Sequence, residues 1–227
     1  MNRPITVVLS LALLGLLGAC SGGDNRYSGG PEPAQEPYRF GLIRMGHWGI
    51  GPIRASTYFE SPDIRELFPN AKVRDVKIRL ADDDSEDGIT VTQDGVELIE
   101  IDDSTIDTGP DQDPPIGQVR AIAGPVIGQN GETLGMSWTA AKFDLSQCEI
   151  GVERDRNTVI CARRGEGAIT YQFAVPTWDS EEVPPESLIR KVGYLKAFIW
   201  TPPPPPEPSS APNASHAATQ PPTKSST

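Results

Sequence analysis

Histidine is scarce: this chain of 227 residues has only two. Cysteine and methionine occur three times each. His216 lies in a stretch rich in proline and serine, so a histidine-dependent hydrolase or zinc site would rest on His47 alone. Neither a Gly-x-Ser-x-Gly elbow nor a Ser-x-x-Lys motif occurs. We therefore interpret His47 as structural or solvent-facing, and we expect no catalytic residue, no cofactor and no enzyme activity.

Basic residues are also few: 20 Lys and Arg stand against 31 Asp and Glu, for a net charge of −11. Nucleic-acid binding needs a basic footprint, so it is excluded. Thirteen of the acids lie between Asp82 and Asp113, where no Lys or Arg occurs. We interpret this stretch as a solvated acidic loop that discourages strand-to-strand aggregation. Docking to a basic partner is the alternative.

Part of the acidic stretch resembles a calcium loop. Asp83, Asp87 and Asp94 follow the spacing of such a loop in part, and they are weak candidate ligands. The twelfth position of a calcium loop usually holds a bidentate Glu, and helices usually flank it. Here that position is Asp94 and the flanking segments resemble strands. The sequence therefore predicts no metal site, with calcium as the weaker alternative.

The chain lacks an apolar run long enough to cross a bilayer. Its longest run, Ile5 to Ala19, has 15 residues, whereas a core of ~30 Å needs about 20 at ~1.5 Å each. A basic residue before the run and Leu17-Gly18-Ala19-Cys20 at its end are typical of a bacterial lipoprotein signal peptide. We predict that residues 1–19 are a signal peptide and that Cys20 carries acyl chains, which hold the protein on a membrane. Ser21 instead of Asp after the cysteine resembles the Gram-negative signal for the outer membrane, facing the periplasm.

The composition divides the rest of the chain into three parts. Residues 20–37 are rich in Gly, Pro and Glu and predict a flexible tether. Residues 202–227 begin with five prolines and predict a disordered tail. Between them, residues 38–201 predict one globular domain, which is long enough to bury a sizeable core.

Strand patterns dominate this domain. Apolar and polar residues alternate in Lys72–Leu80 and Ile169–Val175, while Tyr194–Trp200 is apolar on both faces, as in a central strand. Asp94-Gly95 predicts a type I′ hairpin turn, and Asp87-Gly88 predicts a second tight turn. Gln118–Ile127 is a further apolar stretch, broken by a Gly-Pro pair.

Helical patterns are few and short. Ser61 is the expected N-cap of one helix, with Pro62 following; a second is expected over residues 136–143 and a third turn over 185–190. The fold class is therefore α+β: a mainly antiparallel sheet with two or three short helices on one face. Gly51-Pro52-Ile53 and Gly124-Pro125-Val126 each precede a helix and several strands, so the domain can contain two similar units.

Cysteine forms one pair besides the predicted lipid site. Cys148 and Cys161 flank a segment that resembles a hairpin with a polar tip. Exported proteins meet an oxidising environment, so we predict a disulfide between them. Closing this loop is worth about 3 kcal/mol in the chain-entropy model.

Several motifs together resemble a known family. They are Gly49–Thr57, then Cys148, and then Asn157–Cys161, Ile169–Phe173 and Leu195–Trp200 in that order. The chain is similar in these motifs to the YfeY-like lipoproteins, a family of uncharacterised bacterial lipoproteins with a domain of unknown function. The resemblance implies a lipid-anchored periplasmic domain with a Cys148–Cys161 disulfide, and it supplies no substrate or catalytic residue.

These observations favour a non-catalytic lipoprotein of the outer membrane that binds an envelope protein or supports an envelope structure. The expected partners are the membrane, through the anchor at Cys20, and a protein of the envelope. A module that binds a small ligand or cation is one alternative. A hydrolase with carboxylate or serine chemistry is another, for which the sequence shows no site.

Overall fold

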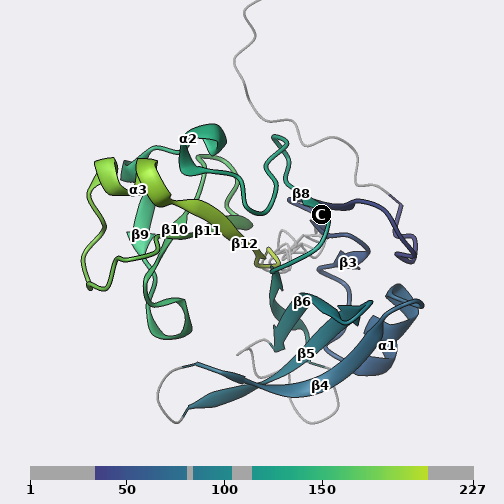
Figure 1. Cartoon of the computed structure of the whole chain (residues 1–227). Helices are drawn as coiled ribbons and strands as arrows, with labels where there is room; N and C mark the ends of the chain where they lie inside the picture. Colours follow the sequence, from purple (N-terminus) through teal and green to yellow (C-terminus); the bar gives the residue numbers. More distant parts are fainter. Residues whose placement is uncertain (1–33, 81–83, 104–113, 204–227) are drawn as a thin grey trace, which may run out of the picture. The chain divides into compact units, whose positions relative to one another are not determined.

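The computed structural model describes residues 34–80, 84–103 and 114–203, all within one compact unit (Figure 1). The predictions for the signal peptide, Cys20, Asp83 and the tail after residue 203 lie outside these residues. In the described part, no helix has the length and apolar character needed to cross a membrane. The predicted α+β class is confirmed: one large antiparallel sheet, one small sheet and three short α-helices.

The large sheet has eight strands in the order β4-β5-β6-β7-β12-β11-β10-β9. It consists of two antiparallel meanders of four strands, which meet where β7 pairs with β12. The first contains β4 (Lys72–Arg79), β5 (Ser85–Gln93), β6 (Val96–Asp103) and β7 (Ile116–Ala121). The second contains β9 (Cys148–Ile150), β10 (Thr158–Cys161), β11 (Ile169–Ala174) and β12 (Tyr194–Trp200). This order fits the two similar units suggested by the sequence, and β12 is a central strand as predicted.

The small sheet has the order β3-β2-β1-β8. Its strands are β1 (Ile43–Gly46), β2 (Gly49–Ile50), β3 (Ile53–Arg54) and β8 (Val126–Ile127), and β1 runs parallel to β8. The turn between β1 and β2 requires glycine, because Gly49 has a φ of +147° and a Cβ there would overlap the carbonyl oxygen of Ile53. The glycine-rich segment is therefore a tight turn between closely spaced strands.

The helices differ from the expectations at their ends. In α1 (Ser61–Leu67) the N-cap is Glu60, not Ser61, because the Ser61 hydroxyl donates to Asp75 Oδ1 at 2.7 Å. The second helix, α2 (Trp138–Ala141), is shorter than predicted, because Lys142 adopts a left-handed conformation and ends it. The third, α3 (Glu186–Val192), is slightly longer than predicted. Two short 3₁₀ turns, η1 (Leu145–Gln147) and η2 (Glu153–Asp155), complete the elements.

One of the two predicted turns is confirmed and the other is wrong. Asp94 and Gly95 join β5 to β6 with φ angles of 51° and 80°, as a type I′ turn requires. Asp87 and Gly88 instead lie inside β5. Gly88 faces the side chain of Ile78 on β4, which leaves no room for a side chain of its own. The glycine there serves packing between strands, not a turn.

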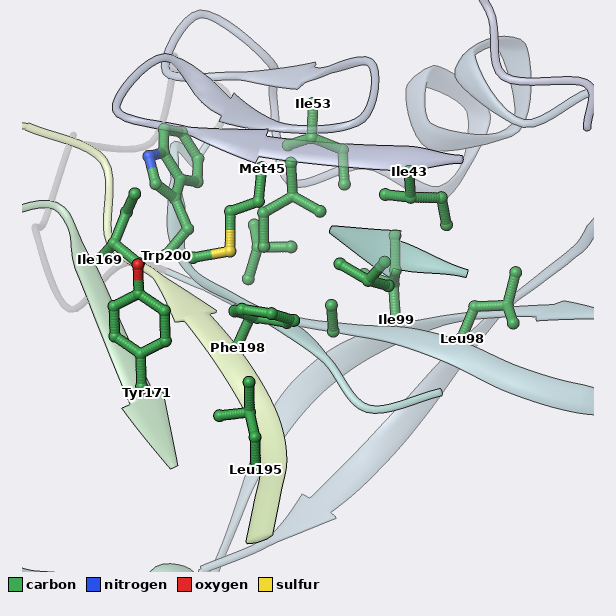
Figure 2. Packing of buried hydrophobic residues seen from close by; sticks show 14 of the residues in the cluster. Ile43, Met45, Ile53, Leu98, Ile99, Ile169, Tyr171, Leu195, Phe198 and Trp200 are labelled. Atoms are coloured by element: carbon green, nitrogen blue, oxygen red, sulfur yellow. The ribbon is translucent and has the colours of Figure 1, made fainter. Parts of the chain in front are cut away.

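The hydrophobic core lies between the small sheet and one face of the large sheet (Figure 2). Figure 2 shows Ile43 and Met45 of β1 facing Ile99, Phe198 and Trp200 of the large sheet, and all five are buried. The Trp200 indole N–H donates to the His47 carbonyl at 3.2 Å, which ties the two sheets together. A second aromatic group packs on β11, where Trp138 lies 4.8 Å from Phe173 between ring centroids.

Candidate functional site

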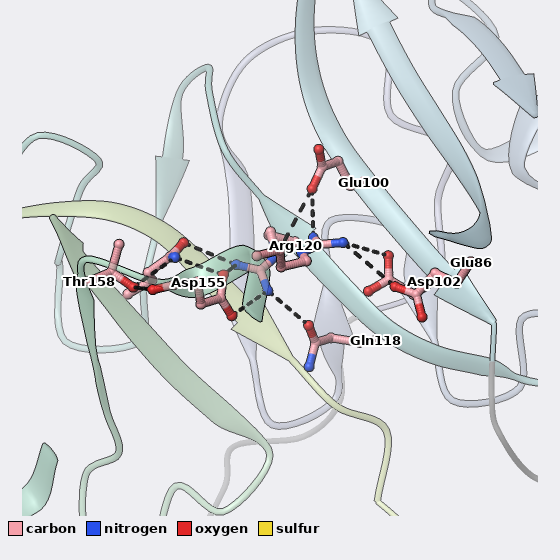
Figure 3. Close-up of polar contacts among 9 residues, drawn as sticks. Glu86, Glu100, Asp102, Gln118, Arg120, Asp155 and Thr158 are labelled. Carbon is pink, nitrogen blue, oxygen red and sulfur yellow. Dashed lines mark hydrogen bonds and ion pairs between the residues drawn. The ribbon is translucent and has the colours of Figure 1, made fainter. Parts of the chain in front are cut away.

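The opposite face of the large sheet carries polar and charged side chains (Figure 3). Successive side chains of a strand point to opposite faces, so Ile99 and Ile101 enter the core while Glu100 and Asp102 lie on the other side. The same alternation places Arg120 of β7 beside Glu100, its partner in the strand register. We call this set the charged face; it comprises Glu86, Glu100, Asp102, Gln118, Arg120 and Gln172 with Arg154, Asp155 and Thr158.

Arg120 lies at the centre of the charged face, and its side chain is only 6% exposed. Its two terminal nitrogens donate to both carboxylate oxygens of Asp155, at 2.8 and 3.0 Å. It also donates to Gln172 Oε1 at 3.0 Å and Gln118 Oε1 at 3.3 Å. This bidentate geometry is the strong form of an arginine–carboxylate pair, and it joins η2 to both meanders.

Arg154 makes the second connection between the meanders. Its Nη2 donates to Glu100 Oε2 at 2.8 Å, and its Nη1 lies 3.7 Å from Glu86 and 3.6 Å from Asp102. Neither Arg154 Nη1 nor Asp102 Oδ1 has a hydrogen-bond partner, although both atoms are buried. These two atoms lie 3.6 Å from each other as an ion pair, just beyond hydrogen-bond distance, so one bridging water molecule would satisfy both.

Two carboxyl groups of the charged face have raised pKa values. Burial raises the pKa of Asp102, and Arg154 and Arg120 offset part of this effect. Burial also raises the pKa of Glu86, and the negative charge of Asp102 adds to the shift. Removal from water disfavours the charged form, which is why both groups hold their protons more tightly than usual.

We expect the contribution of Asp102 to the free energy of unfolding to fall as the pH rises above about 4. Its folded pKa is raised, so the folded chain binds more protons than the unfolded chain and stability declines through the raised pKa. Asp102→Asn removes this contribution. Between pH 4 and pH 7 the free energy of unfolding of the variant should therefore fall less than that of the wild type. Urea unfolding at several pH values measures it, with exposed Asp179→Asn as the control. The same dependence of the free energy of unfolding on pH in all three proteins would contradict the prediction.

Two pockets of about 550 Å³ each lie on the charged face and share Arg120, Arg154 and Asp155. The first, which we call the acidic pocket, is lined by five acids and two arginines; the acids are Glu86, Asp102, Asp103, Glu153 and Asp155. Asp103 and Glu153 form no ion pair with any residue that the structure describes. The second pocket has Glu97 and Glu100 on its rim together with Lys77, Arg79 and Lys196. The acidic pocket therefore has an excess of negative charge.

The calcium-loop candidates do not come together. β5 is extended from Ser85 to Gln93, so Asp87 and Asp94 lie about seven residues apart along it, roughly 23 Å at ~3.3 Å per residue. Asp87 pairs with Lys77 at 2.6 Å, and Asp94 is in the hairpin turn. In the ranges that the structure describes, no group of His, Cys, Asp or Glu is arranged to hold a metal.

The interpretation of residues 82–113 as a solvated loop is wrong for its described part. Residues 85–93 and 96–103 form β5 and β6, and Glu100 and Asp102 are held by arginines within the sheet.

His47 is exposed and lies against Trp48, with 5.2 Å between ring centroids, and it makes no contact with the charged face. Sequence reasoning missed Arg120 and Arg154 as site residues. The signal available was the regular placement of polar residues between buried ones in β6, β7 and β11.

The predicted disulfide is present. Cys148 and Cys161 lie directly opposite each other on β9 and β10, and their sulfurs are bonded. The tip of this hairpin is polar as predicted, and it carries Arg154 and Asp155 back onto the charged face. The disulfide thus closes the base of the hairpin that supplies three residues of the charged face, Arg154, Asp155 and Thr158.

A second polar network is buried near β11. Glu132 accepts from Arg163 Nη2 at 2.9 Å, and Glu166 accepts from the Tyr171 hydroxyl at 2.7 Å. Asn130 donates to both carboxylates. Burial and the neighbouring carboxylates raise the pKa of Tyr171. Both carboxylates already accept hydrogen bonds from neighbouring side chains, so we interpret this network as structural.

The fold is that of an α+β protein in which two antiparallel meanders share one sheet. It is similar to the crystal structure of the uncharacterized protein yfeY from Escherichia coli, with a TM-score of 0.54 at 16% sequence identity. The match covers 71% of this chain and 99% of the other. No family model matches the chain, and no curated protein does. The likeness shows a common fold.

Proposed function

We propose that this chain is a lipoprotein of the outer membrane, lipidated at Cys20 and facing the periplasm, which binds a basic segment of another envelope component without catalysis. The sequence at residues 5–20 supports the anchor, and the Cys148–Cys161 disulfide suits an oxidising compartment. The observation that carries the binding function is the acidic pocket, with its excess of fixed negative charge.

The chemistry of the acidic pocket favours a positively charged group. Arg120 and Arg154 are both engaged with carboxylates, whereas Asp103 and Glu153 form no ion pair within the described ranges. The buried Asp102 Oδ1 accepts no hydrogen bond from a described residue and faces Arg154 Nη1 at 3.6 Å. A lysine or arginine side chain of a partner supplies both the charge and the donors. Complementary charge at such a cleft speeds association and selects partners.

A second candidate function is acid–base hydrolysis. The observation in its favour is the pair of Glu86 and Asp102, two neighbouring carboxyl groups with raised pKa values on the wall of a pocket. Arg154 Nη1 lies within 3.7 Å of both carboxylates, so it occupies the position between them. A reacting substrate atom would have to displace this guanidinium, and for this reason we favour binding over catalysis.

Cross-linking in intact cells, followed by affinity purification and mass spectrometry, tests the proposal. We expect one dominant partner with a basic segment, and we expect its recovery to fall at least fivefold in Asp103→Asn/Glu153→Gln and in Cys20→Ser. The control is Glu149→Gln/Glu181→Gln, which removes two exposed acids elsewhere and should recover the partner as the wild type does.

Three results would overturn the proposal. Equal recovery with the neutralised pocket would remove the acidic pocket from the function. Turnover of a lipid, glycan or peptide by the purified protein, abolished in Glu86→Gln, would make it an enzyme. A thermal shift with a small polyamine but no protein partner would replace the basic segment with a small organic cation, whose size suits a pocket of about 550 Å³.

A further inference from the structure

Three exposed apolar side chains lie around one pocket beside β6. Phe40 is 83% exposed, Leu42 56% and Val96 49%, and all three line one shallow pocket of about 510 Å³. We call these three residues the apolar patch. The other large apolar side chains that the structure shows as exposed do not line this pocket. Contiguous exposed apolar surface of this kind marks an interaction site, whereas single exposed residues do not.

The apolar patch is held in place by the residues around it. The Tyr38 N–H donates to the Leu67 carbonyl at 2.8 Å, and the Tyr38 ring packs on Phe68 with 5.8 Å between centroids. The Tyr38 hydroxyl donates to the Gly41 carbonyl at 2.9 Å. The side-chain amide of Asn70 donates to the Arg39 carbonyl at 3.3 Å. Phe40 is therefore presented to solvent by a fixed loop.

Arginine side chains border the apolar patch. A second pocket of about 540 Å³ shares Phe40 and Leu42 and is lined by Arg39, Arg44 and Trp48. Arg39 and Arg44 are exposed, and neither forms an ion pair with another described residue. Glu36 and Asp94 are the acids on the rims of the two pockets. Arginine beside exposed aromatic and aliphatic residues suits the interface of a membrane, where the stems lie among lipids and the guanidinium groups meet phosphates.

We propose that the apolar patch rests on the membrane surface, with Phe40 and Leu42 among the lipid headgroups and Arg39 and Arg44 at lipid phosphates. This inference rests on the lipid anchor of the proposed function. Thirteen residues, Ser21 to Pro33, separate Cys20 from the first described part, a reach of roughly 20 Å for a flexible coil.

The anchor also explains why a small patch suffices. A domain on so short a tether meets the bilayer at an effective concentration of about millimolar, so a weak contact becomes a lasting one. The two arginines counter the repulsion between anionic lipid and a chain of net charge −11. Among possible occupants, the bilayer is the one that the anchor holds beside this part of the chain.

Sedimentation with lipid vesicles tests this contact without the anchor. The protein is the full mature chain with Cys20→Ser, and the vesicles contain phosphatidylethanolamine and phosphatidylglycerol at 3:1. We expect a pelleted fraction that falls at least fivefold in Phe40→Ser/Leu42→Ser. Arg39→Gln/Arg44→Gln should lower it severalfold and remove its dependence on salt. Vesicles of phosphatidylcholine should bind more weakly than the anionic ones.

The matched control is Val152→Ser, because Val152 is 69% exposed and lies outside the apolar patch. It should pellet like the parent protein. The inference is overturned when the parent protein pellets no more than Phe40→Ser/Leu42→Ser, and circular dichroism checks that this variant is folded. A band at twice the mass in cross-linked samples without vesicles, lost in Phe40→Ser/Leu42→Ser, would assign the apolar patch to a second copy instead. Since this protein carries no lipid, the result is independent of whether Cys20 is acylated in cells.

Discussion

Replacing Arg120 with methionine will lower the free energy of unfolding at pH 7 by about 3–5 kcal/mol. The guanidinium is 6% exposed, and its removal leaves the Asp155 carboxylate and the Gln172 side chain without their main partner. Methionine keeps much of the volume of the stem, so most of the loss comes from an uncompensated buried charge. Urea unfolding followed by circular dichroism measures the change.

The control for this substitution is Arg190→Met. Arg190 pairs with Glu186 on α3, and both side chains are 53% exposed, so the pair contributes at most about 1 kcal/mol. Arg120→Met/Asp155→Asn should recover part of the loss, because the unpaired charge is then gone. Similar losses for Arg120→Met and Arg190→Met would show that water already screens the charged face.

Removing the disulfide will produce the second large effect. Cys148→Ala/Cys161→Ala should lower the free energy of unfolding by about 3 kcal/mol, because the unfolded chain gains conformational entropy when the disulfide no longer closes its loop. For a domain of this size the melting temperature should fall by roughly 6–12 °C. Alanine is chosen over serine because Cys161 is fully buried and a hydroxyl there would lack water.

The wild type in reductant should melt like the double variant, and its intact mass should rise by about 2 Da on reduction. Ala162→Ser, an exposed change next to Cys161, is the control and should leave the melting temperature unchanged. Labelling of both thiols in protein isolated without reductant would refute the bond in cells.

Much of the fold could be predicted because its signals are local. The alternation in β11, the type I′ turn at Asp94 and Gly95, and the opposed cysteines each depend on residues close in sequence. Gly88 misled the prediction, since its role is set by Ile78 on the neighbouring strand. A glycine needed for space and a glycine needed for a turn look the same in a sequence.

The candidate site could not be predicted, because its contacts join distant segments. Arg154 bonds Glu100 from 54 residues away, and Arg120 bonds Asp155 from 35 residues away. From the sequence alone, without these pairings, the acids of β6 are expected to face solvent. The alternation of β6 does indicate that Glu100 and Asp102 share a face. It does not indicate that η2 covers that face.

The position of β12 has a consequence for the order in which the protein folds. Residues 194–200 form the last strand in the described part of the chain, yet they fill the centre of the large sheet between β7 and β11. Until they arrive, both meanders have an unpaired inner edge, and such edges invite aggregation. The contacts that join the meanders also span a long stretch of sequence, which makes folding slow. Under the export that we propose, this delay is useful, because the large sheet cannot close before residues 194–200 have crossed the membrane.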